Sequence, residues 1–142
     1  MSSLKQAQHF ITVETRGQGL HEITDRVGGW VAELAMETGI VTLFCRHTSA
    51  SLTIQENADP DVQRDIEAFL GRLVPESPNL YRHMMEGPDD MPAHIKSALT
   101  DVSLSIPLSA GRLVLGTWQG IFLCEHRSRP HRREVVLHAT GQ

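Results

Sequence analysis

Short stretches of alternating polar and apolar residues, or of consecutive apolar residues, recur along the chain. Residues 9–14 alternate with a period of two, as a half-buried strand does. Similar patterns bounded by turn residues predict further strands at residues 40–46, 52–56, 104–106, 112–115, 121–125 and 134–139. Most of the predicted strands therefore lie after residue 100.

A first helix is predicted between residues 21 and 37, where helical spacing replaces the alternation. The apolar residues at this spacing are Ile23, Val27, Trp30, Val31 and Leu34. Gly39 follows as a C-terminal stop signal, because glycine readily adopts the backbone conformation that ends a helix.

A second helix is predicted to begin at Asp59 and Pro60. Aspartate is a favoured N-cap residue, and proline suits the first helical position. One apolar stripe follows before the stop at Pro75, and it consists of Val62, Ile66, Phe69, Leu70 and Leu73. A loop over residues 76–90 then leads to a short third helix that begins near Pro92.

The order of these elements indicates the fold class. Strands and helices do not alternate strictly, which disfavours a doubly wound parallel sheet. We expect an α+β fold with a mainly antiparallel, β-sandwich-like core and flanking helices. A length of 142 residues suits a single domain that spans residues 1–142.

Composition and charge narrow the class of protein. Hydrophobic residues make up 40% and charged residues 21%, which is typical of a folded globular chain. The formal net charge of −4 lacks the basic excess of a nucleic-acid-binding protein. No apolar run approaches about 18 residues, and residues 1–6 lack the apolar segment of a signal peptide. We expect a cytoplasmic protein with no nucleic-acid or membrane partner.

The two cysteines, Cys45 and Cys124, lie inside predicted strands and do not form a C-x-x-C motif. We interpret them as buried free thiols, which behave as small apolar residues. A thiolate metal ligand and a disulfide remain the alternatives.

The segment from His83 to Ser97 concentrates reactive side chains around a Gly-Pro turn and a helix start. Its two histidines are His83 and His94, and neutral imidazole is the commonest metal ligand in proteins. With His47 as the third ligand and a water, they would make an open zinc site. The segment also contains three carboxylates, Glu86, Asp89 and Asp90. These three favour magnesium as an alternative metal, or else Asp89 and Asp90 simply cap the helix.

The period of two places His47 and Glu125 at the ends of buried strand faces. One face of the strand at 41–47 carries Val41, Leu43 and Cys45 before His47. Likewise, Glu125 follows two apolar residues on one face of its strand. Both ionisable groups are therefore candidates for a polar pocket. The alternatives are a capped strand end for His47 and a solvated group or ion-pair partner for Glu125.

The third helix start also predicts an anion site. Unpaired N–H groups near Pro92 would point outward, and phosphate binds readily at such a position. The side chains that could complete this site are Thr48, Ser49, Ser51, Lys96 and Ser97. A small phosphorylated substrate would suit it, although the Ser/Thr run is also typical of an ordinary turn.

Two more segments contain candidate polar groups. Asn57 lies where a strand meets the second helix, and it either contributes to the site or shapes the turn. Gln119 follows Trp118 in a predicted hairpin turn, where a large aromatic residue is unusual. Trp118 would cover a neighbouring chain, roof a pocket that Gln119 lines, or pack in the core.

Four blocks together resemble the YjbQ-like family, whose members are described as secondary thiamine-phosphate synthase enzymes. The blocks are residues 47–52, residues 56–60, residues 83–97, and residues 116–121 followed by Glu125, His126 and Arg127. The similarity extends from about residue 8 to about residue 140.

The resemblance implies a homotrimer with a compact α+β fold and a metal held by histidines near a subunit boundary. It assigns the ligand role to His47, His83 and His94. Acid/base or ligand-orienting roles go to the group Glu125, Asn57 and Asp90. It also implies a weak activity that joins a pyrimidine methyl diphosphate to a thiazole phosphate and releases pyrophosphate.

The leading hypothesis is therefore a metal-dependent enzyme, with zinc favoured and magnesium possible, and with weak thiamine-phosphate synthase activity. Displacement of pyrophosphate needs charge neutralisation on the leaving group more than it needs a protein nucleophile. One alternative is a metal-dependent hydrolase of a small phosphate ester or amide. Another is a non-catalytic trimeric module that binds a metal or an anion.

Overall fold

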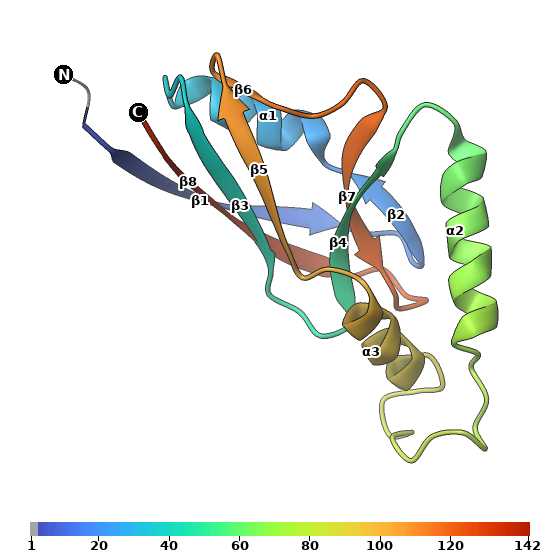
Figure 1. The fold of residues 1–142 in the computed structure, drawn as a ribbon. Helices are drawn as coiled ribbons and strands as arrows, with labels where there is room; N and C mark the ends of the chain where they lie inside the picture. The colour runs from blue at the N-terminus through green and yellow to red at the C-terminus, as the bar shows by residue number, and fades with distance from the viewer. Residues whose placement is uncertain (1–2) are drawn as a thin grey trace.

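The computed structural model describes residues 3–142. Strands dominate the chain, and three helices flank them within the described residues (Figure 1). The strands are β1 (Lys5–Glu14), β2 (Gly19–Glu22), β3 (Gly39–Cys45), β4 (Ala50–Glu56), β5 (Ser103–Ser109), β6 (Arg112–Leu113), β7 (Gln119–Glu125) and β8 (Arg132–Gly141). The helices are α1 (Thr24–Glu33), α2 (Pro60–Leu73) and α3 (Asp90–Leu99).

The strands form two antiparallel sheets. The larger has the order β1-β8-β3-β5-β6, and the smaller has the order β2-β7-β4. Every pair of neighbouring strands in both sheets is antiparallel. This arrangement confirms the predicted α+β fold with a mainly antiparallel core and flanking helices.

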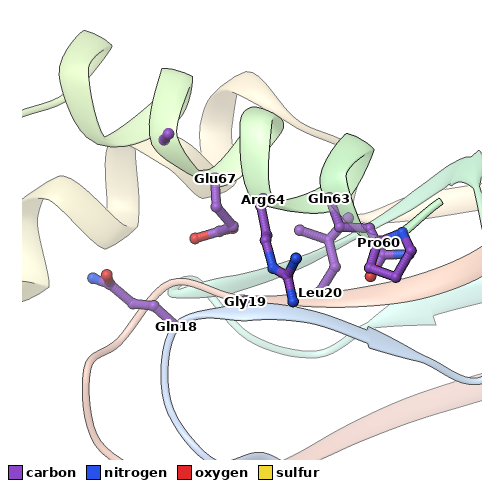
Figure 2. A pocket seen from close by; sticks show the side chains of 8 residues that line it. Gln18, Gly19, Leu20, Pro60, Gln63, Arg64 and Glu67 are labelled. Carbon is purple, nitrogen blue, oxygen red and sulfur yellow. The ribbon is translucent and has the colours of Figure 1, made fainter.

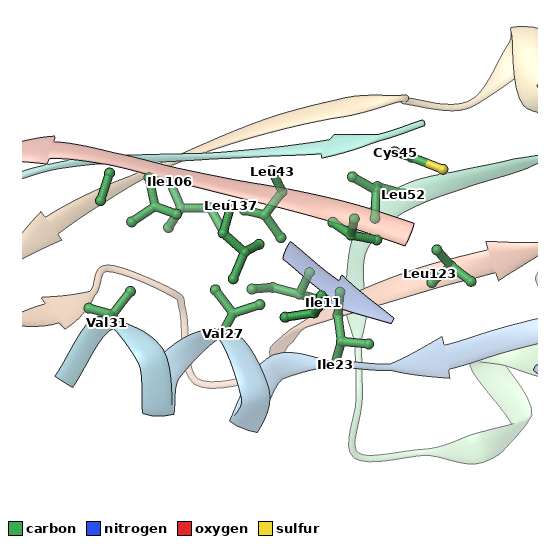
Figure 3. Packing of buried hydrophobic residues seen from close by; sticks show 14 of the residues in the cluster. Ile11, Ile23, Val27, Val31, Leu43, Cys45, Leu52, Ile106, Leu123 and Leu137 are labelled. Carbon is green, nitrogen blue, oxygen red and sulfur yellow. The ribbon is translucent and has the colours of Figure 1, made fainter. Parts of the chain in front are cut away.

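The hydrophobic core lies between the two sheets and α1 (Figure 3). Val41, Leu43 and Cys45 alternate with less buried residues in β3, as their period of two predicts. Opposite them, Leu52 and Leu123 contribute from the smaller sheet. Burying a side chain of this size stabilises the fold by about 1.5–3 kcal/mol. Cys45 and Cys124 are both buried free thiols, which confirms their predicted state.

The first helix is shorter than predicted. Residues 19–22 form β2 and pair with β7, because hydrogen bonds along that sheet edge outweigh the helical pattern. Ala35, with φ of 53°, adopts the left-handed conformation after the helix. Gly39 has a different function, since a Cβ there would lie 2.4 Å from the Thr140 carbonyl oxygen. Glycine at this position permits β3 and β8 to approach closely.

The second helix begins as predicted, but it packs loosely. The Asp59 carboxylate accepts a hydrogen bond from the Asp61 N–H at 2.9 Å, and Pro60 is the first helical residue. The apolar stripe is only partly covered, because Phe69 and Leu73 are each 55% exposed. Figure 2 shows the cleft of about 580 Å³ between α2 and the start of β2. None of the helices within residues 3–142 is long and apolar enough to cross a membrane.

Candidate metal centre

His83, Asp90 and His94 converge at the start of α3. His83 lies in the preceding loop, Asp90 is the first helical residue, and His94 follows one turn later on the same face. The Asp90 Oδ2 atom lies 2.7 Å from His83 Nε2 and 3.0 Å from His94 Nε2. All three potential ligand atoms lie within 4.8 Å of one another. Three side chains that can bind a metal therefore share one small region.

The hydrogen bonds of His94 leave a place for a cation between its ring and Asp90. His94 Nδ1 lies 2.7 Å from the Thr48 backbone oxygen, which can only accept, so Nδ1 carries a proton. In the neutral ring, Nε2 then presents a lone pair to the Asp90 carboxylate. Two acceptors at 3.0 Å repel each other unless a proton or a metal ion lies between them. An Nδ1–H bond to a backbone carbonyl is also the usual way in which a metal-binding histidine is oriented.

Asp90 has the charge that this role requires. It is 4% exposed, and the Arg127 guanidinium contacts its second oxygen, Oδ1, at 2.9 Å. Burial alone would raise the pKa of Asp90. The hydrogen bond from His83 and the charge of Arg127 outweigh burial and hold the pKa below its usual range. Asp90 is therefore a carboxylate at neutral pH.

Helix α3 is aligned by hydrogen bonds along β4. Besides the contact of His94 with Thr48, the Ser97 hydroxyl donates to the Ala50 carbonyl at 3.0 Å. One turn later the Thr100 hydroxyl contacts Ser51. These regularly spaced contacts fix the rotation of the helix, and with it the direction in which His94 points.

The third predicted ligand, His47, does not belong to this convergent group. Its Nε2 accepts a hydrogen bond from the Glu134 backbone N–H at 2.8 Å. Burial and then the charge of Arg133 lower its pKa, which indicates a neutral ring that serves as an acceptor. The structure therefore brings together two of the three predicted imidazoles, and Asp90 supplies the third group.

Glu125 occupies an enclosed ion-pair network. Its carboxylate is fully buried and accepts from the Arg133 guanidinium, from the Thr15 hydroxyl at 2.7 Å and from the Arg127 N–H at 3.1 Å. Burial would raise its pKa, but these hydrogen bonds prevail and lower it. No face of the carboxylate is left for a substrate. The geometry indicates an anchor for the end of β7, and the acid/base role of Glu125 stays a prediction.

Most of the predicted phosphate-binding side chains are buried or already engaged. Ser51, Lys96 and Ser97 are each at most 5% exposed. The Ser49 hydroxyl accepts from Arg133 at 3.0 Å. Thr48, which is exposed beside His94, is the one of the five that can reach a ligand at this site without rearrangement.

Asn57 and Gln119 lie at the opposite end of the β4–β7 pair from the metal group. Glu56 pairs with Gln119, whereas Ala50 pairs with Glu125, so the two ends are separated by about 20 Å along the strands. The Asn57 amide donates to Glu22 at 2.9 Å, and the Gln119 side chain accepts from a backbone N–H of its own turn. Within a single chain, Asn57 and Gln119 therefore lie far from His83 and His94.

Three further features of the structure were not apparent from the sequence. Trp118 is 62% exposed, so a core position for it is wrong. Asp89 makes no side-chain capping bond and instead accepts from Arg127 and Ser128. The His126 ring is 1% exposed and contacts the Ser51 hydroxyl at 2.8 Å. Strand alternation predicts that His126 points to the face opposite that of Glu125, but the neighbouring sequence does not show which residues cover that face.

Known proteins share both the sequence and the fold. A UPF0047 protein of Synechocystis sp. is 52% identical over 99% of this chain and 96% of its own. YjbQ of Escherichia coli O157:H7 is 42% identical over 95% of this chain and 98% of its own. A conserved hypothetical protein of Thermus thermophilus has a solved structure with a TM-score of 0.79 and 42% identity. The similarity covers 90% of this chain and 97% of that one.

A second solved structure is that of a YbjQ-like protein of unknown function from Sulfolobus solfataricus P2. It superposes with a TM-score of 0.90 at 25% identity, over 99% of this chain and 100% of that one. The family model described as "UPF0047 protein YjbQ-like" matches residues 9–142. The match covers every strand and helix of the fold except the first residues of β1, and the chain belongs to the YjbQ-like UPF0047 family.

Proposed function

We propose that this chain is a metal-dependent enzyme whose divalent ion is held by His83, Asp90 and His94. The observation that carries the proposal is the contact between His94 Nε2 and Asp90 Oδ2, where a bound cation would join the lone pair of a neutral ring to the carboxylate. A tetrahedral ion with bonds of about 2 Å holds its ligands about 3.3 Å apart. The two contacts, at 2.7 and 3.0 Å, would each lengthen by about 0.3–0.6 Å to reach that spacing.

The donor set favours zinc. Two imidazoles and one carboxylate are the ligands of an open, catalytic type of zinc site, whereas magnesium prefers oxygen ligands. The side chains of His83 and His94 are 41% and 31% exposed, so a substrate has access to the group. A bound ion would act as a Lewis acid toward a phosphate oxygen or would activate a water molecule.

The substrate that we propose is a small phosphorylated molecule, and the reaction is weak thiamine-phosphate synthesis. The support for this reaction is the activity that the resemblance to the YjbQ-like family implies. Within the chain, the exposed Thr48 lies beside His94, and its hydroxyl can bind a phosphate oxygen. A cytoplasmic homotrimer is part of the same proposal.

A metal-dependent hydrolase is the second candidate. The observation that favours it is the burial of Ser51, Lys96 and Ser97, which leaves no broad cradle for a diphosphate beside the histidines. A small ester or amide needs less anion binding than a diphosphate. In that reaction His83, Asp90 and His94 would hold the ion, and the attacking group would be water.

Metal content provides the first test. After loading with zinc and dialysis, we expect His83→Ala and His94→Ala to lose the bound ion, whereas the exposed His9→Ala serves as the matched control and keeps it. Mass spectrometry of the metals gives the stoichiometry. Full occupancy in both site variants would contradict the proposed centre.

Activity provides the second test. Purified protein is incubated with the pyrimidine diphosphate and the thiazole phosphate, with and without zinc, and pyrophosphate release is measured. The same preparations are tested on a panel of phosphate esters. Zinc-dependent pyrophosphate release that is lost in His94→Ala supports the synthase. Zinc-dependent ester cleavage without it supports the hydrolase, and zinc binding with no effect on any rate indicates a binding module.

A further inference from the structure

We propose that Arg127 is the positioning residue of the candidate metal centre, an inference that rests on the proposed function. Its side chain is 17% exposed and lies between the end of β7 and the start of α3. It contacts Asp90, Asp89 and the loop that contains His83. Arg127 is not itself a metal ligand, so its effect acts through the groups that it holds.

The guanidinium uses all three of its nitrogens. Nη1 lies 2.9 Å from Asp90 Oδ1, and Nε lies 2.9 Å from Asp89 Oδ2. Nη2 donates to the Glu86 carbonyl at 2.9 Å and lies 3.4 Å from Asp89 Oδ1. A planar fork with this many fixed donors is specific to arginine, and a lysine ammonium cannot reproduce it.

The contact with Asp90 decides which carboxylate oxygen is available to an ion. Arg127 engages Oδ1, so Oδ2 alone faces the two imidazoles. This arrangement holds Asp90 as a ligand through one oxygen. It also fixes the carboxylate plane before an ion arrives, so binding does not have to order it.

The contacts with Glu86 and Asp89 fix the loop that carries His83. The Ser128 backbone N–H and hydroxyl both donate to Asp89 Oδ2, at 2.9 and 3.1 Å. Together these contacts form a junction between the residues after β7 and the loop before α3. Gly87, between Glu86 and Asp89, has a φ of 105°, a conformation that glycine tolerates. Through this junction, the position of His83 depends on β7.

The junction itself is anchored in the protein interior. The Arg127 backbone N–H donates to Glu125, whose carboxylate is bound by the buried Arg133. A rigid chain of contacts therefore connects the core to Asp90. Removing a group that orients metal ligands typically weakens metal binding about 10- to 100-fold.

Zinc affinity, measured by competition with a chromophoric chelator, tests the inference. We expect Arg127→Ala and Arg127→Lys to bind zinc about 10- to 100-fold more weakly than the unaltered chain. Arg129→Ala is the matched control, because Arg129 is exposed two residues further along. The visible spectrum of cobalt-loaded protein should change in both Arg127 variants, since the ligand geometry changes, but not in the control.

Chemical rescue separates positioning from folding. Millimolar guanidinium chloride, a concentration below the denaturing range, should restore much of the zinc affinity of Arg127→Ala, whereas equal sodium chloride should not. Zinc affinity of both Arg127 variants within twofold of the unaltered chain would overturn the positioning role while leaving the metal centre intact. Absence of zinc binding in the unaltered chain would overturn the proposed function itself.

Discussion

Two buried carboxylates, Asp90 and Glu125, have opposite surroundings. Asp90 has one oxygen directed toward two partly exposed imidazoles, so it can exchange a partner for an ion. Glu125 has four hydrogen bonds and no exposed surface. A carboxylate can take part in chemistry only if a substrate or ion can reach it. On this basis we assign Asp90 to the candidate metal centre and Glu125 to the framework beneath it.

We predict that Glu125→Gln lowers stability without removing the metal. The substitution leaves the buried Arg133 guanidinium without its counter-charge, and breaking a buried pair costs about 3–5 kcal/mol. Urea unfolding measures the loss, and metal analysis of the same sample gives the occupancy. Glu134→Gln is the matched control. Its pair with Arg46 is 41–52% exposed, and we expect it to cost at most about 1 kcal/mol. Unchanged stability with lost catalysis would support the acid/base role of Glu125.

We predict that His126 makes the fold sensitive to mild acid. Burial and then the charge of Lys96 lower its pKa from 6.5 to about 4. The unfolded chain therefore takes up a proton at a higher pH than the folded chain. The free energy of unfolding should fall as the pH drops from 6.5 towards 4, by about 3 kcal/mol in total.

Urea midpoints at several pH values between 7 and 4.5 measure this dependence. His126→Gln removes the titrating ring but can still form a hydrogen bond with the Ser51 hydroxyl, so its midpoint should vary less over this range. His47, whose pKa is also lowered, contributes to the dependence that remains. A pH dependence in His126→Gln equal to that of the unaltered chain would contradict the prediction.

Elements that depend on contacts between sequence neighbours could be predicted, whereas elements that depend on pairing with distant segments could not. The capped start of α2 and the alternation in β3 depend on neighbours in the sequence, and both are confirmed. The second half of β2, His21 and Glu22, lies in the segment predicted to be helical, because its pairing with the distant β7 is invisible locally. Within the candidate site, a short segment of sequence contains all three convergent groups. The junction made by Arg127 joins residues 38 positions apart, so it required the fold.

We predict that Ala35→Gly stabilises the end of α1. Ala35 is exposed and has a φ of 53°, which costs a residue with a Cβ about 1–2 kcal/mol. Glycine loses more chain entropy on folding, so the expected net gain is about 0.5–1 kcal/mol. Thermal unfolding measures the gain.

Ala32→Gly provides the matched control for this substitution. Ala32 is also exposed, but it lies inside α1, where glycine is expected to cost about 1 kcal/mol. We therefore expect Ala35→Gly to raise the stability of the fold and Ala32→Gly to lower it. A loss of stability in Ala35→Gly as large as that in Ala32→Gly would contradict the interpretation of this helix end.

At the scale of the whole molecule, one sheet face is buried and the opposite face is left open. The inner faces of both sheets enclose the core together with α1. On the outer face of the five-stranded sheet, Phe10 and Phe44 flank Val136 in one row of paired residues. Phe10 is 53% and Phe44 is 47% exposed, and the Arg46 guanidinium lies over the Phe10 ring at 5.9 Å, so the row forms an apolar patch bordered by a charged group. Such patches often mark surfaces of association.

We predict that this row contributes to self-association into the proposed homotrimer. Analytical ultracentrifugation of the unaltered chain should give three times the chain mass of 15.8 kDa. Phe44→Ser should shift the population to the monomer, because a hydroxyl replaces apolar contact area. Val114→Ser, an exposed apolar position away from the row, should leave the mass unchanged. A monomeric unaltered chain would contradict the trimer.

The alignment of α3 along β4 has a consequence for solubility. Strand β4 lies at the edge of its sheet, where unpaired backbone N–H and C=O groups can pair with a strand of another molecule and so promote aggregation. Here the carbonyls of Thr48 and Ala50 accept from α3, and the Leu52 N–H donates to the Asp101 carbonyl just beyond the helix. The helix that supplies two of the convergent groups thus also shields the first residues of this edge, so variants that detach it should aggregate and should also fail to bind the proposed ion.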